Sequence, residues 1–190
     1  MDKALVVASV ASMISQFNLH NIKILQELGY KVVVATNFDK PGNISFTLAQ
    51  KLIKQLEDEG VDCININFAR SPFSFKNIGA YQMLKNIIYD EGIKLIHAHS
   101  PVGGVITRVL VLNNDQKRLI YTAHGFHFFK GASIKNWLTF YPIEKFFSYF
   151  TDDLITINSE DFQLAKKSFH AKRLHYVNGV GIDSVSYTHL

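Results

Sequence analysis

The chain has 190 residues, of which 47% are hydrophobic and 19% charged, with a formal net charge of +4 at pH 7. This composition is typical of a globular protein with one core and argues against a disordered chain. The positive charge is modest and no long basic block occurs, so a phosphate or an anionic membrane is a possible partner and nucleic acid is not expected. We expect no membrane-spanning helix, because no run of about 18 apolar residues occurs. The single cysteine, Cys63, leaves no internal disulfide and suits a reducing compartment.

Seven short apolar runs, rich in β-branched residues, predict buried β-strands, and helical patterns lie between them. In chain order these runs cover residues 4–10, 31–36, 61–68, 94–99, 118–124, 153–158 and 174–179. Their nearly continuous apolar character is expected of strands that are covered on both faces. The first run also argues against reading the N-terminus as a secretory signal peptide, since its basic region is minimal and a helical pattern follows.

The segments between the runs carry helix signals. Apolar residues three or four apart predict helices at 19–28 and 81–88, with a glycine near the end of each. Ser100 and Pro101 predict another helix start, because a serine hydroxyl can cap free backbone N–H groups and proline fits the first helical position. Ser159 opens a further helix, with two acids in its first turn that suit the positive end of the helix dipole.

The alternation of strand and helix predicts one α/β domain of the doubly wound, Rossmann-like type. Right-handed crossovers would build a mostly parallel sheet of about seven strands with helices on both faces. Ligands of such sheets bind beyond the carboxyl ends of the strands, where loops lead into helices. The residues at those ends are therefore the candidates for a site.

Polar residues collect at four of these predicted strand ends. They lie in the hydroxyl-rich loop 11–16 and in the sequences HAHS (97–100), HGFH (124–127) and NS (158–159). Because His97 and His99 alternate along a strand, we expect one of them to be a structural residue between a helix and the sheet. The strand-end positions of His99 and His124 favour a place in a cleft, whereas His127 is more typical of loop packing.

Phosphate-binding glycine motifs are absent. No G-x-G-x-x-G follows the first strand and no G-x-x-x-x-G-K-[ST] occurs, which argues against a nucleotide hydrolase or a simple dinucleotide-binding protein. Gly103 and Gly104 lie in the first turn of a predicted helix. They would allow close approach either of a phosphate or of a neighbouring backbone, and both interpretations stay open.

Ten of the 24 aromatic residues fall between positions 126 and 150, interleaved with lysines. We expect Pro142 to bend or divide the helix of this segment. Exposed rings with lysines are typical of a surface that lies in a membrane headgroup zone or grips a lipid tail. The expected members of this membrane or acceptor surface are Phe128, Phe129, Lys130, Lys135 and Trp137. The alternative is that the rings pack across the sheet edge or against another domain.

The stretch YTAHGFHFFKGASIKNWLTFYPIEKFFSYFTDDLITIN, with IHAHSPVGGVITR before it and YVNGVGID after it, resembles the N-terminal domain of family-4 glycosyltransferases with the GT-B fold. It is most similar to the bacterial branch that builds capsular polysaccharide, exopolysaccharide or O-antigen on a lipid carrier. The resemblance covers residues 3–183. It implies an acceptor-side domain at 1–183, a donor domain after it that is missing from the chain, and sugar transfer with retention, without a metal or any cofactor besides the nucleotide-sugar donor.

The resemblance also implies roles for particular residues. His124 matches the family's strand-end histidine, which faces the transferring sugar and is expected to be catalytic. His99 and Ser100 match a loop that borders the same cleft. Ser12 and Ser15 lie where the family approaches the donor phosphates, although many members have two glycines there. Further substrate contacts are expected from Gly125, His127, Asn158 and Ser159.

The resemblance extends to partners and to the end of the chain. Expected partners are a nucleotide-sugar, a polyprenyl-linked saccharide acceptor and the inner face of the cytoplasmic membrane, where the protein would be peripheral. Residues 184–190 do not read as the family's continuation and are interpreted as a foreign tail. Without the second domain and its acids, the fragment alone is expected to be inactive.

Two alternatives to this reading stay open. One is a metal-dependent hydrolase that uses His97, His99, His124 and His127, as the H-x-H and H-x-x-H spacings suggest. No acidic residue at the neighbouring strand ends completes such a site. The other is a non-catalytic, membrane-docking subunit of a split glycosyltransferase.

Overall fold

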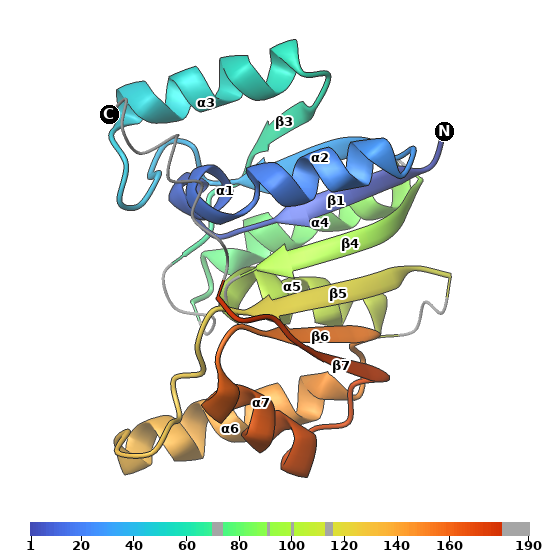
Figure 1. Ribbon diagram of the computed structural model, residues 1–190. Coiled ribbons are helices and arrows are strands. Elements are labelled where there is room, and N and C mark those ends of the chain that lie inside the picture. Colours follow the sequence, from blue (N-terminus) through green and yellow to red (C-terminus); the bar gives the residue numbers. More distant parts are fainter. Residues whose placement is uncertain (70–73, 91, 100, 113–115, 180–190) are drawn as a thin grey trace.

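The computed structural model describes the chain except residues 70–73, 91, 100, 113–115 and 180–190. Within the described ranges, seven parallel strands form one sheet with helices on both faces (Figure 1). The strands are β1 (Lys3–Val7), β2 (Lys31–Thr36), β3 (Asp62–Asn65), β4 (Ile93–His99), β5 (Arg118–Ala123), β6 (Asp153–Thr156) and β7 (Arg173–Tyr176). The predicted doubly wound α/β fold is confirmed. The expected domain limit at 183 and the tail at 184–190 lie outside the described residues.

The strand order is β3-β2-β1-β4-β5-β6-β7, and every neighbouring pair is parallel. The chain therefore winds outward in one direction from β1 to β3 and in the other from β4 to β7. The carboxyl ends of β1 and β4 lie side by side where the direction reverses, and this is the position at which open α/β sheets bind ligands.

The helices are α1 (Ala11–Phe17), α2 (Leu19–Glu27), α3 (Phe46–Asp58), α4 (Asn77–Asp90), α5 (Pro101–Val111), α6 (Ile134–Ser148) and α7 (Ser159–Ser168). One expectation was wrong, because the segment 11–16 is not a loop but most of helix α1. Pro142 was expected to bend or divide α6, and the helix continues through it undivided. The cap of α7 is Asn158, whose side chain accepts from the Asp161 N–H, and Ser159 is the first helical residue.

The sheet separates two apolar cores. Alternate residues of β1 point to opposite faces, so Ala4 and Val6 pack with α1, α2 and α3, whereas Leu5 and Val7 pack on the other side. That second core includes buried residues of α4, α5 and α7 together with Phe126 and Phe128 from the segment after β5. Helices α1 to α3 thus cover one face of the sheet, and α4 to α7 lie on the other (Figure 1).

Gly104 lets α5 lie close against β5. A Cβ atom at Gly104 would come within 2.5 Å of Cε2 of Tyr121 and within 3.2 Å of a guanidinium nitrogen of Arg108. Of the two interpretations of the paired glycines, the structure therefore shows close packing at Gly104.

A buried ion pair fastens α6 to this core. Arg108 Nη1 of α5 lies 2.8 Å from Glu144 Oε2 of α6, and both side chains are almost fully buried. The Tyr121 hydroxyl donates to the other oxygen of Glu144 at 3.3 Å, and the guanidinium lies 4.2 Å from the centre of the Tyr121 ring.

Among the described helices, none is both long and apolar enough to cross a membrane.

Candidate active site at the carboxyl ends of the strands

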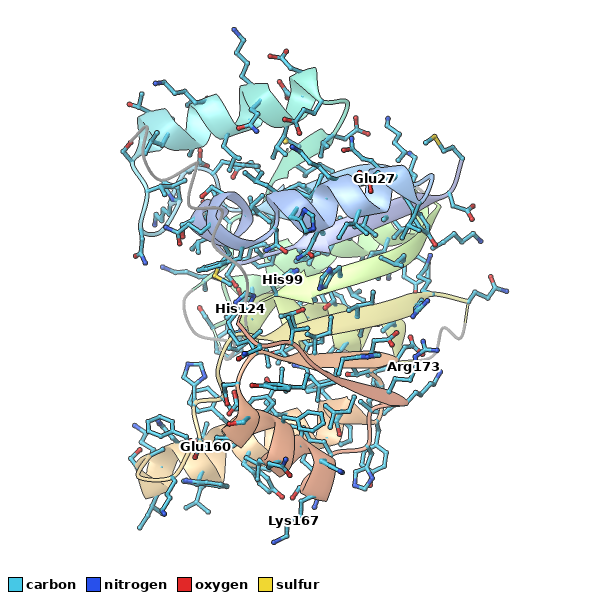
Figure 2. All side chains as sticks on the ribbon, in the orientation of Figure 1. Glu27, His99, His124, Glu160, Lys167 and Arg173 are labelled. Atoms are coloured by element: carbon cyan, nitrogen blue, oxygen red, sulfur yellow. The ribbon has the colours of Figure 1, made fainter. Side chains whose placement is uncertain are left out.

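Three histidines meet at the carboxyl ends of β4 and β5. His97 and His99 project from β4, and their ring centres are 4.1 Å apart. His97 Nε2 lies 2.8 Å from Thr122 Oγ1, and His99 Nδ1 lies 3.1 Å from His124 Nε2. Figure 2 shows His99 and His124 beside each other at this edge of the sheet. The register of two parallel strands thus brings together residues that are 25 positions apart.

The expectation that one of His97 and His99 would be a structural residue is confirmed at His97, which is buried and bonded to Thr122. Residues two apart on a strand point to the same face, and both side chains are buried, His99 completely. His97 is satisfied by Thr122. His99 supports His124 through one ring nitrogen, and its other nitrogen, Nε2, is buried with no hydrogen-bond partner among the described residues.

Burial keeps the histidines of this cluster neutral. Desolvation, and next the charge of His124, lower the pKa of His97 to about 4. Desolvation also holds the pKa of His99 well below its ordinary value, with smaller contributions from His97 and His124, and lowers the pKa of His124. In a neutral pair one ring donates and the other accepts, so the His99–His124 contact couples the tautomers of the two rings and orients the His124 ring.

The start of helix α1 is hydrogen-bonded to the segment after β2. The backbone N–H groups of Ala11 and Ser12 donate to the carbonyls of Asn37 and Pro41 at 3.3 and 2.8 Å. Ser12 is buried beneath this loop, and the Ser15 hydroxyl donates to the Ser12 carbonyl at 3.2 Å. The Ser12 N–H and the Ser15 hydroxyl thus have partners within the chain, and the role of Ser12 and Ser15 toward the donor phosphates stays a prediction. Phe17, at the end of α1, packs against the His124 ring with centres 5.4 Å apart.

A cavity of about 420 Å³ lies beyond the carboxyl end of β5, and its lining begins at Gly125, the residue after His124. Its lining consists of Gly125, Phe126, His127, Phe129, Asn136, Asn158, Glu160 and Asp161. The structure thus brings together the predicted substrate residues Gly125, His127 and Asn158, while Ser159 is not part of the lining and Ser100 lies outside the described residues.

The sequence reasoning missed four members of this lining, which are Phe126, Asn136, Glu160 and Asp161. Glu160 and Asp161 were assigned only to the dipole of α7, and nothing in the sequence singles out Asn136. Asp161 Oδ2 accepts from the Phe126 N–H at 2.9 Å and from the Asn158 side-chain amide at 2.8 Å. Glu160 Oε1 accepts from the Lys130 N–H at 2.7 Å. The loop after β5 is therefore fastened to α7 at two points.

The predicted membrane surface needs correction at Phe128. This ring is completely buried, stacks on Phe126 at 4.9 Å and meets the Tyr141 ring edge-on at 5.5 Å, so it cannot contact a membrane. Trp137 is half-buried, and its indole N–H donates to the Phe129 carbonyl at 3.3 Å. Phe129, Lys130 and Lys135 are exposed, as the prediction requires.

The outer face of α6 presents a longer apolar stripe than the sequence reasoning recognised. Ile134 is 77% exposed and Leu138 74%, and the stripe continues through exposed Pro142, Phe146 and Tyr149. Their spacing of three or four places them on one side of the helix. This spacing is readable in the sequence and could have identified the stripe.

The hydrolase alternative gains no support. In the part of the chain that the structure describes, no group of three or more His, Cys, Asp or Glu side chains is arranged to hold a metal ion. His97 and His99 are bonded within the cluster, and His127 lies apart from it, stacked on Phe140 with ring centres 4.7 Å apart.

Comparison with known proteins establishes the family. A family model described as glycosyl transferase 4-like matches residues 5–158. The Bacillus subtilis (strain 168) protein named "Putative glycosyltransferase EpsD" is 35% identical over 185 residues, which is 96% of this chain and 45% of that protein. The chain belongs to the glycosyl transferase 4-like family, as its sequence motifs indicated, and spans less than half the length of this relative.

Solved structures share the fold at low sequence identity. The S. aureus protein MnaA, solved with UDP, has a TM-score of 0.66 and 11% identity, covering 99% of this chain and 48% of MnaA. Sucrose-phosphate synthase from Thermosynechococcus elongatus gives a TM-score of 0.61 and 14% identity, covering 99% of this chain and 94% of the solved piece. A glycosyltransferase from Rickettsia africae ESF-5 gives 0.58 and 15%, covering 92% and 42%. These likenesses agree with a Rossmann-like half of a GT-B fold.

Proposed function

We propose that this chain is the acceptor-side part of a retaining glycosyltransferase, which moves a sugar from a nucleotide-sugar to a lipid-linked saccharide during synthesis of a bacterial surface polysaccharide. The observation that carries the proposal is His124, which is held by buried His99 at the carboxyl edge of the sheet, next to a cavity. Membership of the glycosyl transferase 4-like family supports sugar transfer as the reaction. The proposed enzyme uses the nucleotide-sugar as a substrate and needs no other cofactor.

The neutrality of His124 suits this chemistry. Sugar transfer passes through a transition state in which the anomeric carbon gains positive charge. A protonated imidazole beside that carbon would repel the developing charge, whereas a neutral ring can donate or accept a hydrogen bond with a sugar hydroxyl. Burial lowers the pKa of His124, which keeps the ring neutral, and His99 fixes its orientation.

The proposal places the protein on the inner face of the cytoplasmic membrane. Its α6 stripe is apolar, Lys135 and Lys145 flank it, and the helix's acidic residue, Glu144, is buried. Such a helix can lie in the interface of an anionic membrane without crossing it. This position would bring a lipid-linked acceptor to the same edge of the sheet as His124.

The experiment uses the protein extended by its C-terminal domain, with a radiolabelled nucleotide-sugar and membranes that contain the polyprenyl-linked acceptor. We expect His124→Ala to lower kcat by roughly 10²-fold or more, with a smaller effect on the KM for the acceptor, because positioning of the transferring sugar is lost. The matched control is His20→Ala on α2, an exposed histidine.

Near-normal turnover of a folded His124→Ala protein would overturn the assignment of His124. If the extended wild-type protein transfers no sugar from any nucleotide-sugar tested, the catalytic proposal itself fails. The 190-residue chain alone should show no transfer, because the proposal assigns donor binding to the second domain.

A further inference from the structure

We infer that the cavity between the β5–α6 loop and the start of α7 binds one neutral sugar ring of the acceptor and rejects sugars that carry a negative charge. This inference deepens the proposed function and rests on it. It concerns a specificity that neither the family match nor the relatives' names address.

The cavity is formed before any ligand arrives. Asp161 and Glu160 hold the backbone of the β5–α6 loop at Phe126 and Lys130 through hydrogen bonds of 2.9 and 2.7 Å. Figure 2 shows Glu160 near this loop, on the same side of the molecule as His124. A preformed cavity of this size can hold a small ligand without the cost of ordering a loop.

Polar groups on the lining are available to hydroxyls. The Asn136 side-chain amide and the ring nitrogens of His127 make no hydrogen bond to a described residue, and only one carboxylate oxygen of Glu160 is used. An amide both donates and accepts, and a carboxylate oxygen accepts, so together they match the hydroxyl groups of a sugar. Exposed Phe129 adds an apolar surface for the C–H face of the ring.

The charge of the cavity selects against anions. Glu160 and Asp161 contribute two carboxylates to the lining, which contains no lysine or arginine among the described residues. The N-terminus of α7 would by itself attract an anion, but these two acids already occupy its first turn. A uronic acid or a phosphorylated sugar would therefore place like charges close together in a partly enclosed site.

The position of the cavity fits an acceptor sugar. Gly125, the residue after His124, and Asn136 in the first turn of α6 both line the cavity. A sugar held there would lie between the proposed reaction centre and the outward stripe of α6, where we place the lipid.

The test is an amide ¹H–¹⁵N NMR titration of the 190-residue chain with paired methyl glycosides. Glucose, galactose and their N-acetylamino forms are the neutral probes, and glucuronic and galacturonic acid are the charged ones. We expect at least one neutral glycoside to shift amides within residues 125–131, 136 and 158–161, and the matching uronate to bind at least tenfold more weakly.

Two variants probe the contacts. Asn136→Ala should weaken binding of the neutral sugar at least fivefold, because it removes a side-chain amide that is not hydrogen-bonded to any described residue. In Glu160→Gln the uronate should bind at most about threefold more weakly than the matching neutral glycoside. The glutamine carbonyl oxygen can still accept from the Lys130 N–H. Glu57→Gln, at an exposed position on α3, is the matched control and should change neither value.

The inference is overturned if no neutral glycoside shifts these amides, if the shifts map elsewhere, or if the uronate binds as well as its neutral partner. Its failure can be told apart from failure of the proposed function. Sugar transfer by the extended enzyme without binding in this cavity removes only the inference. Binding in the cavity without transfer removes only the catalytic proposal.

Discussion

His97 lies at the bottom of the histidine cluster and makes its hydrogen bond to Thr122 from a fully enclosed position. A buried neutral imidazole stabilises the fold only while it remains neutral, because its protonated form would have to be charged away from water. The burial that lowers the pKa values of His97 and His124 therefore makes the fold sensitive to acid.

We predict that the free energy of unfolding falls as the pH drops from 7 to 5. The unfolded histidine takes up a proton below its ordinary pKa of 6.5, whereas burial lowers the folded pKa of His97 to about 4, so the stabilisation is complete above pH 6.5 and is lost toward pH 4. His97 alone should account for roughly 1–2 kcal/mol between pH 7 and 5. Urea denaturation at pH 7 and pH 5 measures the difference in the free energy of unfolding.

His97→Gln separates this effect from other titrating groups. Glutamine can still bond to Thr122 but does not titrate, so the variant should show a smaller pH dependence than the wild-type chain. His20→Gln, at an exposed position, should leave the pH dependence unchanged. Equal pH dependence in wild type and His97→Gln would contradict the prediction.

A second prediction concerns the packing of α5 against β5 at Gly104. Gly104→Ala should lower the free energy of unfolding by roughly 1–3 kcal/mol, because the added methyl would meet the Tyr121 ring in a packed core. Gly79→Ala in α4 is the matched control, since a Cβ there meets nothing within 4 Å. It should raise stability by roughly 0.5–1 kcal/mol through helix propensity. Thermal or urea denaturation of both variants measures these changes. An unchanged free energy of unfolding in Gly104→Ala would show that α5 can move away from β5.

Helix α6 combines an inner face that fixes its place with an outer face that has no described partner. Glu144 reaches inward to Arg108 and Tyr121, and Ser148 Oγ accepts from the His170 N–H at 2.9 Å. A buried ion pair is costly to disturb, because removing either partner leaves an uncompensated charge in the core. The apolar stripe is thus held on a rigid support, although Pro142 interrupts the helix hydrogen bonds.

We predict that the double variant Ile134→Glu/Leu138→Glu weakens binding to vesicles of anionic lipid at least tenfold without lowering the free energy of unfolding. Both side chains are highly exposed, so charges are tolerated in water but not in the membrane interface. Co-sedimentation with vesicles measures binding, and added salt should weaken the wild-type interaction through the lysines. Leu28→Glu, at a 69% exposed leucine after α2, is the control. Unchanged binding of the double variant would remove the membrane assignment of α6.

At the scale of the whole molecule, the sequence predicted the sheet well because parallel strands need apolar residues on both faces. All seven observed strands begin within one residue of the start of a predicted run. His99 and His124 meet at one edge because neighbouring parallel strands end there, and their roles in substrate binding stay predictions. The contact from Asp161 to Phe126 joins residues 35 positions apart and depends on how α7 meets the β5 loop, which no local pattern specifies. The burial of Phe128 likewise depends on α6 and α7 covering it. Residues 11–16 were wrongly expected to form a loop, because small, hydroxyl-bearing residues occur in both loops and short helices.

The strand order has a consequence for synthesis of the protein. β1 is made first, yet one of its two neighbours is β4, which ends at His99. At roughly 5–20 residues per second, this neighbour follows β1 by about 5 to 20 seconds. Throughout that interval β1, an interior strand with buried valines, has at least one unpaired edge on the ribosome. The nascent chain therefore passes through a stage in which a chaperone, or a strand of another nascent chain, can bind the edge of β1 that later pairs with β4.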